Sequence, residues 1–181
     1  LSNRIGLMER LTSAVNRARG EGAYRFVLLF MDLDRFKLIN DSLGHAAGDR
    51  LLISVSGRLE QFIREANITY GGNGLAARLG GDEFVLLVEN VRDAEAAHEL
   101  CRRVLDVLRT PHQIEGRDVA STASIGVSLG DAACDSAADM LRDADTAMYK
   151  AKNAGRARWA LFDRALREAT QARLEVELDL Q

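Results

Sequence analysis

The chain has 181 residues, of which 47% are hydrophobic and 28% charged, a profile typical of one globular domain with an ordinary core. Its formal net charge of −3 and its scattered Lys and Arg residues exclude a strongly basic surface, so we expect no nucleic-acid partner. No apolar run approaches the length of a membrane helix, and the N-terminus lacks the pattern of a signal peptide.

The two cysteines, Cys101 and Cys134, are far apart in the sequence, which favours buried free thiols in a reducing compartment over a disulfide. We therefore expect a cytoplasmic domain. The chain begins with Leu1 rather than Met. We also expect it to be a piece of a longer protein, whose other parts can include a sensor or a membrane anchor.

The first part of the chain predicts a helix, a strand and two more helices. Apolar spacing over 2–19 is helical, and the continuous apolar run FVLLFM at 26–31 is typical of a strand buried on both faces. A short helix is expected over 35–43. The longer helix after it has its core stripe at Leu52, Val55, Leu59 and Phe62.

The middle of the chain predicts a hairpin with acidic residues at its tip. Residues 68–74 are rich in turn formers, and 76–79 and 83–88 have the composition of strands. The connection between these strands is Gly80-Gly81-Asp82.

The last part predicts a helix over 93–108 that ends before Pro111, and a strand over 119–129. Another helix follows and is closed by Gly155, and its inward face is Ala137, Leu141, Ala144, Met148 and Ala151. A short strand is expected around 159–162. The elements indicate an α+β fold with a mixed, partly antiparallel central sheet flanked by helices.

Residues 163–181 have the pattern of a charged helix without a stop signal. We expect this segment to be a linker helix toward a following domain, which leaves 1–162 as the domain itself.

Acidic residues end one predicted strand and begin another. Asp32 follows the buried strand directly, and Asp82 with Glu83 lies at the hairpin tip, so three carboxylates converge if the two strands are neighbours. Oxygen ligands of this kind bind hard divalent cations, and Mg²⁺ usually takes one or two carboxylates plus substrate phosphates. The helix that opens at Phe36 and Lys37 presents free backbone N–H groups, which bind anions.

Lys152 and Arg156 lie four residues apart near a helix end and form a cationic pair if the last helical turn persists. Alone, each of these motifs is explained by turn, cap or helix-dipole chemistry. Their joint occurrence around one predicted sheet edge favours a site for a metal ion and a phosphorylated ligand. His45, His98 and His112 are expected to be turn, surface or core residues rather than ligands.

Three segments resemble the GGDEF domain family, the diguanylate cyclases. They are RLGGDEF at 78–84, MDLDRFKLINDSLGHAAGD at 31–49 and ADTAMYKAKNAGRAR at 144–158, and SNRIGLMERL at 2–11 is similar to the family's opening helix. Three motifs in the family order are far more specific than the pentapeptide alone.

The resemblance implies a fold similar to the nucleotidyl cyclases and the polymerase palm, which is ferredoxin-like. It implies condensation of two GTP molecules to cyclic di-GMP and pyrophosphate across a two-fold homodimer, with Mg²⁺ or Mn²⁺ as cofactor. The residues that it implies are as follows: Asp32, the carbonyl of Leu33, Asp82 and Glu83 at the metal, with Asp82 and Glu83 catalytic; Asn40 and Asp49 at guanine; and Lys152, Arg156 and the amides of Phe36 and Lys37 at the phosphates.

One departure from the family pattern concerns feedback. Many members have Arg-x-x-Asp five residues before the Gly-Gly pair as a product-inhibition site, whereas here residues 71–74 are Gly-Gly-Asn-Gly. We therefore expect no inhibition through that primary site.

Two other functions are compatible with the sequence. The first is a catalytically silent GTP-binding domain that regulates an adjacent phosphodiesterase domain of the EAL type, because the charged segment from Asp163 resembles the connector of composite relatives. The second is a purely structural dimerisation module, which leaves the acidic residues unexplained.

Overall fold

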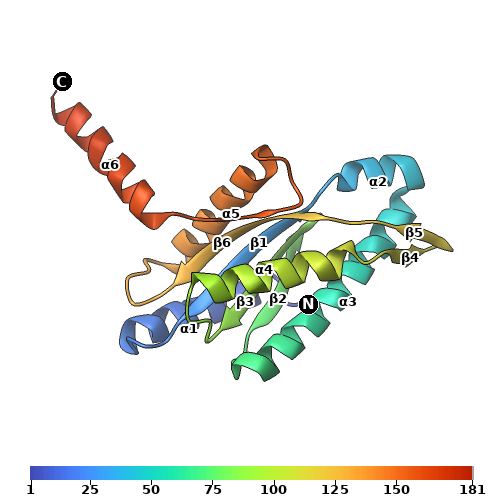
Figure 1. The fold of residues 1–181 in the computed structure, drawn as a ribbon, viewed down its shortest axis with the longest axis horizontal. Helices are drawn as coiled ribbons and strands as arrows, with labels where there is room; N and C mark the ends of the chain where they lie inside the picture. The colour runs from blue at the N-terminus through green and yellow to red at the C-terminus, as the bar shows by residue number, and fades with distance from the viewer. Residues whose placement is uncertain (181) are drawn as a thin grey trace.

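A computed structural model describes the backbone of residues 1–180 and the side chains of residues 1–164 and 172–180 (Figure 1). In chain order the elements are α1 (Arg4–Gly20), β1 (Phe26–Leu33), α2 (Phe36–Leu43), α3 (His45–Tyr70), β2 (Leu75–Gly80), β3 (Glu83–Glu89), α4 (Ala94–Arg109), β4 (His112–Ile114), β5 (Arg117–Val119), β6 (Ala123–Gly130), α5 (Ala137–Asn153), β7 (Trp159–Leu161) and α6 (Arg164–Asp179).

The centre of the domain is a five-stranded sheet with the strand order β2-β3-β1-β6-β7. The first four strands pair in antiparallel fashion, and β7 is added parallel to β6 at one edge. All eight residues of β1 are buried, as expected for the apolar run between two neighbouring strands. The expected α+β class with a partly antiparallel sheet is confirmed.

Helices cover both faces of the sheet, and alternate residues of β1 pack against different helices. Val27, Leu29 and Met31 belong to the core formed with α3 and α4, whereas Leu28 and Phe30 belong to the core formed with α1 and α5. This alternation follows from the two-residue period of a strand. Figure 1 shows α6 extending away from the sheet.

Two expectations about element boundaries are wrong. The segment 68–74 is not all turn, because α3 continues to Tyr70 and ends where Gly71 adopts a left-handed backbone with φ of 71°. The strand expected over 119–129 is two strands, since β5 pairs with β4 in a separate hairpin and β6 begins only at Ala123. The hairpin turns at Glu115 and Gly116, both with positive φ, as a tight two-residue turn requires.

Several other expectations can be compared directly with the structure. Cys101 and Cys134 are buried free thiols, as expected. Within residues 1–180, no helix has the length and apolar character needed to cross a membrane. The expected C-terminal helix is present as α6, its role as a linker stays a prediction, and Gln181 lies outside the described residues.

Gly126 allows α5 to lie unusually close to β6. A Cβ atom at this position would overlap the carbonyl oxygen of Ala144 and the backbone nitrogen of Met148, neither of which can move without shifting the helix. The distance between α5 and the sheet therefore depends on this glycine.

We expect Gly126→Ala to lower the free energy of unfolding by roughly 1–3 kcal/mol, because the added methyl group overpacks the contact with α5. Gly57→Ala is the matched control: nothing lies within 4 Å of its added Cβ, so it should stabilise α3 by roughly 0.5–1 kcal/mol. Urea unfolding of both variants measures the difference. Equal effects of the two substitutions would contradict the close approach at Gly126.

Candidate functional site

The acidic residues of the two predicted strands meet at one end of the sheet. Strands β1 and β3 are neighbours, and Asp32 lies directly opposite Glu83 in their register. The backbone N–H of Leu33 donates to the carbonyl oxygen of Asp82 at 3.2 Å, which places Asp82 beside the end of β1. The expectation that the strands adjoin and bring these acids together is confirmed.

Register also sets the face on which the acids lie. Asp32 continues the row of Leu28 and Phe30, and Glu83 begins the row of Val85 and Leu87; these four apolar residues belong to the core under α1 and α5. The carboxylates therefore lie on the side of the sheet from which α5 approaches.

Burial and neighbouring charges raise the pKa values of Asp82 and Glu83. Burial, followed by the neighbouring Asp32 carboxylate, raises the pKa of Asp82 from 3.8 to about 7. The pKa of Glu83 is also raised, by burial and then by the charges of Asp32 and Asp145. The site thus holds negative charges that repel one another, which a bound cation would relieve.

Lys152 supplies positive charge to this corner. Its Nζ donates to Oδ2 of Asp32 at 2.5 Å across 120 residues of sequence. Burial alone would lower the pKa of Lys152, but the bond to Asp32 and its charge outweigh burial, so the pKa is raised. Lys152, one of the two basic residues expected at the site, is thus paired with Asp32, one of the expected acids.

Arg156 differs from its expected placement. Helix α5 ends at Asn153, so the last turn does not continue to hold Lys152 and Arg156 on one helical face. The chain leaves the helix through Gly155, Arg156 and Ala157, all with positive φ. Arg156 is exposed on this turn, and its backbone N–H donates to the carbonyl of Ala151 at 3.1 Å.

The N-terminus of α2 lacks a side-chain cap. Its N-cap residue, Arg35, has a left-handed backbone with φ of 56° and forms no side-chain cap. The first N–H groups of the helix, at Phe36 and Lys37, therefore have no capping side chain, as an anion site requires.

Asn40 and Asp49 come from adjoining helices. A Cβ atom at Gly48 would overlap the side-chain oxygen of Asn40, so this glycine allows the Asn40 amide to lie against the start of α3. Asp49 lines a pocket of about 480 Å³ along the same helix, with Leu52, Ile53, Ser56, Gly57, Glu60 and Arg78 as its other lining residues.

The acids do not form a conventional multidentate metal cluster. Within the described part of the chain, no group of three or more His, Cys, Asp or Glu side chains is arranged to hold a metal ion. Mg²⁺ does not require one, because it usually binds through one or two carboxylates and completes its shell with phosphates and water. Two aspartates and one backbone carbonyl fit that requirement.

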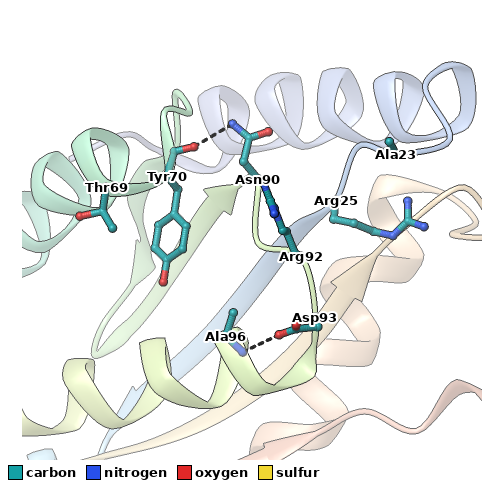
Figure 2. Close-up of a pocket in the computed structure, with 8 residues that line it drawn as sticks. All are labelled: Ala23, Arg25, Thr69, Tyr70, Asn90, Arg92, Asp93 and Ala96. Carbon is teal, nitrogen blue, oxygen red and sulfur yellow. Dashed lines mark hydrogen bonds between the residues drawn. The ribbon is translucent and has the colours of Figure 1, made fainter.

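A second pocket, of about 570 Å³, lies at the opposite end of the sheet (Figure 2). Arg25 precedes the first residue of β1, and Asn90 follows the last residue of β3, so both lie at the end of the strands away from Asp32. Asn90 donates to the carbonyl of Tyr70 at 3.2 Å, and Asp93 caps α4 by accepting from Ala96 N–H at 2.8 Å (Figure 2). This pocket is separate from the acidic corner.

The turn at 71–74 is held by hydrogen bonds to α3 and α1. Gly74 N–H donates to Oδ1 of Asn67 at 2.7 Å, and Arg10 donates to the carbonyl of Asn73. A Cβ atom at Gly74 would overlap the Leu87 carbonyl oxygen, so β2 and β3 leave no space for a side chain there.

Sequence reasoning gave no role to Asp34, which the structure connects to the site. Its carboxylate accepts hydrogen bonds from Thr122, Ser124 and the backbone of Ala157, next to Arg156. The only signal in the sequence is its spacing of two residues from Asp32, and nothing there identifies the donors.

The sequence matches the family model described as "Diguanylate cyclase, GGDEF domain" over residues 1–158. The chain belongs to the GGDEF domain family. Its RLGGDEF segment covers the end of β2, the hairpin tip and the start of β3, and the tip contributes Asp82 to the acidic corner.

Relatives of this GGDEF domain include parts of larger proteins. It is 38% identical over 181 residues to the bifunctional diguanylate cyclase/cyclic di-GMP phosphodiesterase MucR of Pseudomonas aeruginosa, covering all of this chain and 25% of MucR. It is 36% identical over 165 residues to the cyclic di-GMP phosphodiesterase NbdA of the same organism, covering 91% of this chain and 20% of NbdA. The crystal structure of the GGDEF domain of YfiN (TpbB) from P. aeruginosa superposes with a TM-score of 0.81 at 36% identity, covering 90% and 97% of the two chains.

Repulsion within the acidic corner predicts a pH-dependent effect of Asp82→Asn. The pKa of Asp82 is about 7 in the folded domain and 3.8 ordinarily, so between these values the unfolded chain loses a proton that the folded domain keeps. Wild-type stability therefore falls as the pH rises through this window, and the variant escapes the loss. With a chelator present, we expect the variant to be more stable above pH 7 by roughly 1–2 kcal/mol, since solvent screens part of the interaction.

Urea unfolding at pH 4 and pH 8 tests this expectation, because the advantage of Asp82→Asn should disappear at the lower pH. Asp131→Asn is the control, because the pKa of Asp131 is lowered rather than raised, with backbone and Arg164 bonds outweighing burial. A difference between Asp82→Asn and wild type that does not change with pH would contradict the repulsion.

Proposed function

We propose that this domain is a diguanylate cyclase that condenses two GTP molecules into cyclic di-GMP and pyrophosphate. The observation that carries the proposal is the meeting of Asp32, Asp82 and Glu83 at one sheet end, with Lys152 bonded to Asp32 at 2.5 Å. Membership in the GGDEF family supports this chemistry over a structural dimerisation module, which gives these acids no role.

The residues that would hold Mg²⁺ or Mn²⁺ are Asp32, Asp82 and the carbonyl of Leu33, with Glu83 adjoining. All four lie on the paired ends of β1 and β3 or on the hairpin tip between β2 and β3. When bound, the cation supplies charge neutralisation on phosphate oxygens and favours ionisation of the attacking hydroxyl.

The protein's own donors hold the triphosphate. The uncapped N–H groups of Phe36 and Lys37 form an electropositive helix end that suits an anion, and Arg156 adds a charged donor on an exposed turn. Lys152 already lies at the carboxylates and can exchange its bond to Asp32 for one to a phosphate oxygen.

Guanine is assigned to the α2–α3 junction. Asn40 supplies an amide with both donors and an acceptor, and Asp49 supplies acceptors that suit the N–H groups of the guanine edge. The pocket of about 480 Å³ beside Asp49 has space for a base.

The reaction joins the 3′ oxygen of one GTP to the α-phosphorus of another and breaks the bond from that phosphorus to the β-phosphate oxygen. The proton of the 3′ hydroxyl needs an acceptor, and Glu83 or Asp82 suits this role because a raised pKa brings a carboxyl closer to neutral pH. One site holds one GTP, so two copies of the domain must face each other across a two-fold axis. A domain that uses GTP as its substrate is expected in the cytoplasm. The full-length protein is expected to carry sensor or EAL domains as well.

A second candidate function is a silent GTP-binding domain that regulates an adjacent EAL phosphodiesterase. The observation that favours it is the relative NbdA, which is 36% identical and is named only as a phosphodiesterase. The intact acids, Lys152 and Arg156 favour catalysis, because regulation by GTP binding alone does not need a proton acceptor.

Asp82→Ala should give a folded domain with no detectable cyclic di-GMP formation, because it removes a metal ligand and a candidate proton acceptor. The assay uses GTP and Mg²⁺ at protein concentrations that force dimers. Glu99→Ala removes an exposed acid that is bonded to Arg102 on α4, and should leave turnover unchanged. Product formation by Asp82→Ala would contradict the cyclase site, and wild-type GTP binding without product would favour the regulatory function.

Introducing the family's Arg-x-x-Asp motif at 71–74 should not produce product inhibition by cyclic di-GMP. The double variant Gly71→Arg, Gly74→Asp supplies the charges of Arg-x-x-Asp, but Gly71 has a left-handed backbone and a Cβ at position 74 overlaps Leu87. We expect a loss of stability on the order of 2 kcal/mol and no tight cyclic di-GMP binding by calorimetry. Gly22→Arg is the control for an added charge where the new Cβ meets nothing. Tight cyclic di-GMP binding by the double variant or by wild type would contradict the conclusion that this turn cannot form the inhibitory site.

A further inference from the structure

We propose that Asp34 is a positioning residue for the phosphate-binding cations. It holds the turn that carries Arg156 against the end of β1, and so fixes that turn relative to the acidic corner. This inference rests on the proposed function, because it assigns the turn to the triphosphate of GTP.

The Asp34 carboxylate is buried and accepts three hydrogen bonds. Oδ1 accepts from the Ser124 hydroxyl at 2.7 Å, and Oδ2 accepts from the Thr122 hydroxyl at 2.7 Å. Oδ2 also accepts from the backbone N–H of Ala157 at 3.0 Å, and only 8% of Asp34 is exposed. A buried carboxylate with this many donors is costly to desolvate and is retained only when the bonds to it are strong.

The turn that Asp34 holds is a strained one. Gly155, Arg156 and Ala157 have φ of 124°, 63° and 48°, so two residues with side chains occupy the left-handed region in succession. Each such residue is strained and persists only when surrounding bonds determine its conformation. The bond from Ala157 N–H to Asp34 is one of those bonds, and it lies one residue from Arg156.

Asp34 also ties the turn to the strand that carries Asp32. Its own backbone N–H donates to the carbonyl of Thr122 at 2.9 Å, and Ser124 lies opposite Asp32 in the β1–β6 register. One side chain therefore connects the end of β1, the start of β6 and the turn after α5. Loss of the carboxylate would release the turn while leaving Asp32 and the sheet in place.

Electrostatics and positioning predict opposite results for Asp34→Ala. Removing a negative charge near Arg156 and Lys152 would, by charge alone, strengthen the binding of an anion. Release of the turn would weaken it, because Arg156 would no longer be held where the phosphates bind. The sign of the change in affinity for a triphosphate thus separates the two effects.

The experiment measures binding to this chain by calorimetry with Mg²⁺. The ligands are 3′-deoxyGTP, which lacks the attacking hydroxyl, and GMP, which lacks the β- and γ-phosphates. We expect Asp34→Ala to weaken 3′-deoxyGTP roughly tenfold and to leave GMP unchanged. Asp34→Asn should recover most of the affinity, since the amide oxygen can accept from Ala157 and Thr122 while the amide N–H donates to Ser124.

Two controls keep the result specific. Asp131→Ala removes a carboxylate that also accepts from a backbone N–H in a turn, that of Ala133 at 2.9 Å, and should change neither affinity. In the Arg156→Ala background, Asp34→Ala should add little further loss, because both changes remove the same contact. Amide hydrogen exchange of residues 155–158 should be faster in Asp34→Ala and unchanged in Asp131→Ala.

Unchanged or stronger 3′-deoxyGTP binding by Asp34→Ala would overturn the inference, as would an equal loss for GMP. If Asp34→Ala does not fold, Thr122→Val removes one of the three bonds and should give a smaller loss for 3′-deoxyGTP alone; equal binding to wild type would then overturn it. A wild-type chain that binds neither ligand would overturn both the proposed function and this inference. Wild-type binding with no effect of position 34 would overturn only the inference.

Discussion

The pairing of β1 with both β3 and β6 is the constraint on which the site depends. Register places Asp32 opposite Glu83 on one side and opposite Ser124 on the other. A slip of one residue would turn Asp32 to the other face and bury Leu33 beside α5 in its place, because strand side chains alternate. The apolar alternation of β1 between two helical layers therefore fixes the positions of the acids as well as the core.

The crowding of carboxylates at the acidic corner destabilises the free domain. Burial and then the Asp32 carboxylate raise the pKa values of Asp82 and Glu83, and the Asp32–Lys152 pair offsets only part of the repulsion. Lys152 can stay with Asp32 in the absence of ligand because Gly126 lets α5 lie close to the sheet. The same close approach brings the strained turn after α5 within reach of Asp34. Packing of one helix thus positions both the Asp32–Lys152 pair and the turn that carries Arg156.

Local patterns predicted the parts of the fold that depend on local signals. The buried run at 26–31 and the Gly-Gly-Asp tip between two apolar segments were sufficient to predict β1 and the β2–β3 hairpin. The β4–β5 hairpin was missed because its strands have three residues each and are partly polar. The Asp34 contacts were not predictable, since its donors lie 88 to 123 residues away in the sequence and are ordinary hydroxyl and amide groups. The left-handed backbone of residues 155–157 was not predictable either, because the sequence there indicates only the end of a helix.

The glycines of the turn at 71–74 have a structural role. Glycine at 72 and 74 lets the turn lie directly on β3, because a Cβ at Gly72 would come within 2.8 Å of the Glu89 Cβ. Arg10 of α1 bonds both to this turn and to Glu89, at 2.9 Å for the latter, and the Tyr24 hydroxyl donates to the same carboxylate at 2.8 Å. Side chains at these two positions would separate the turn from the strand and remove one of the bonds that hold α1. Gly72 and Gly74 therefore help to hold the first helix against the sheet, because they keep the turn within reach of Arg10.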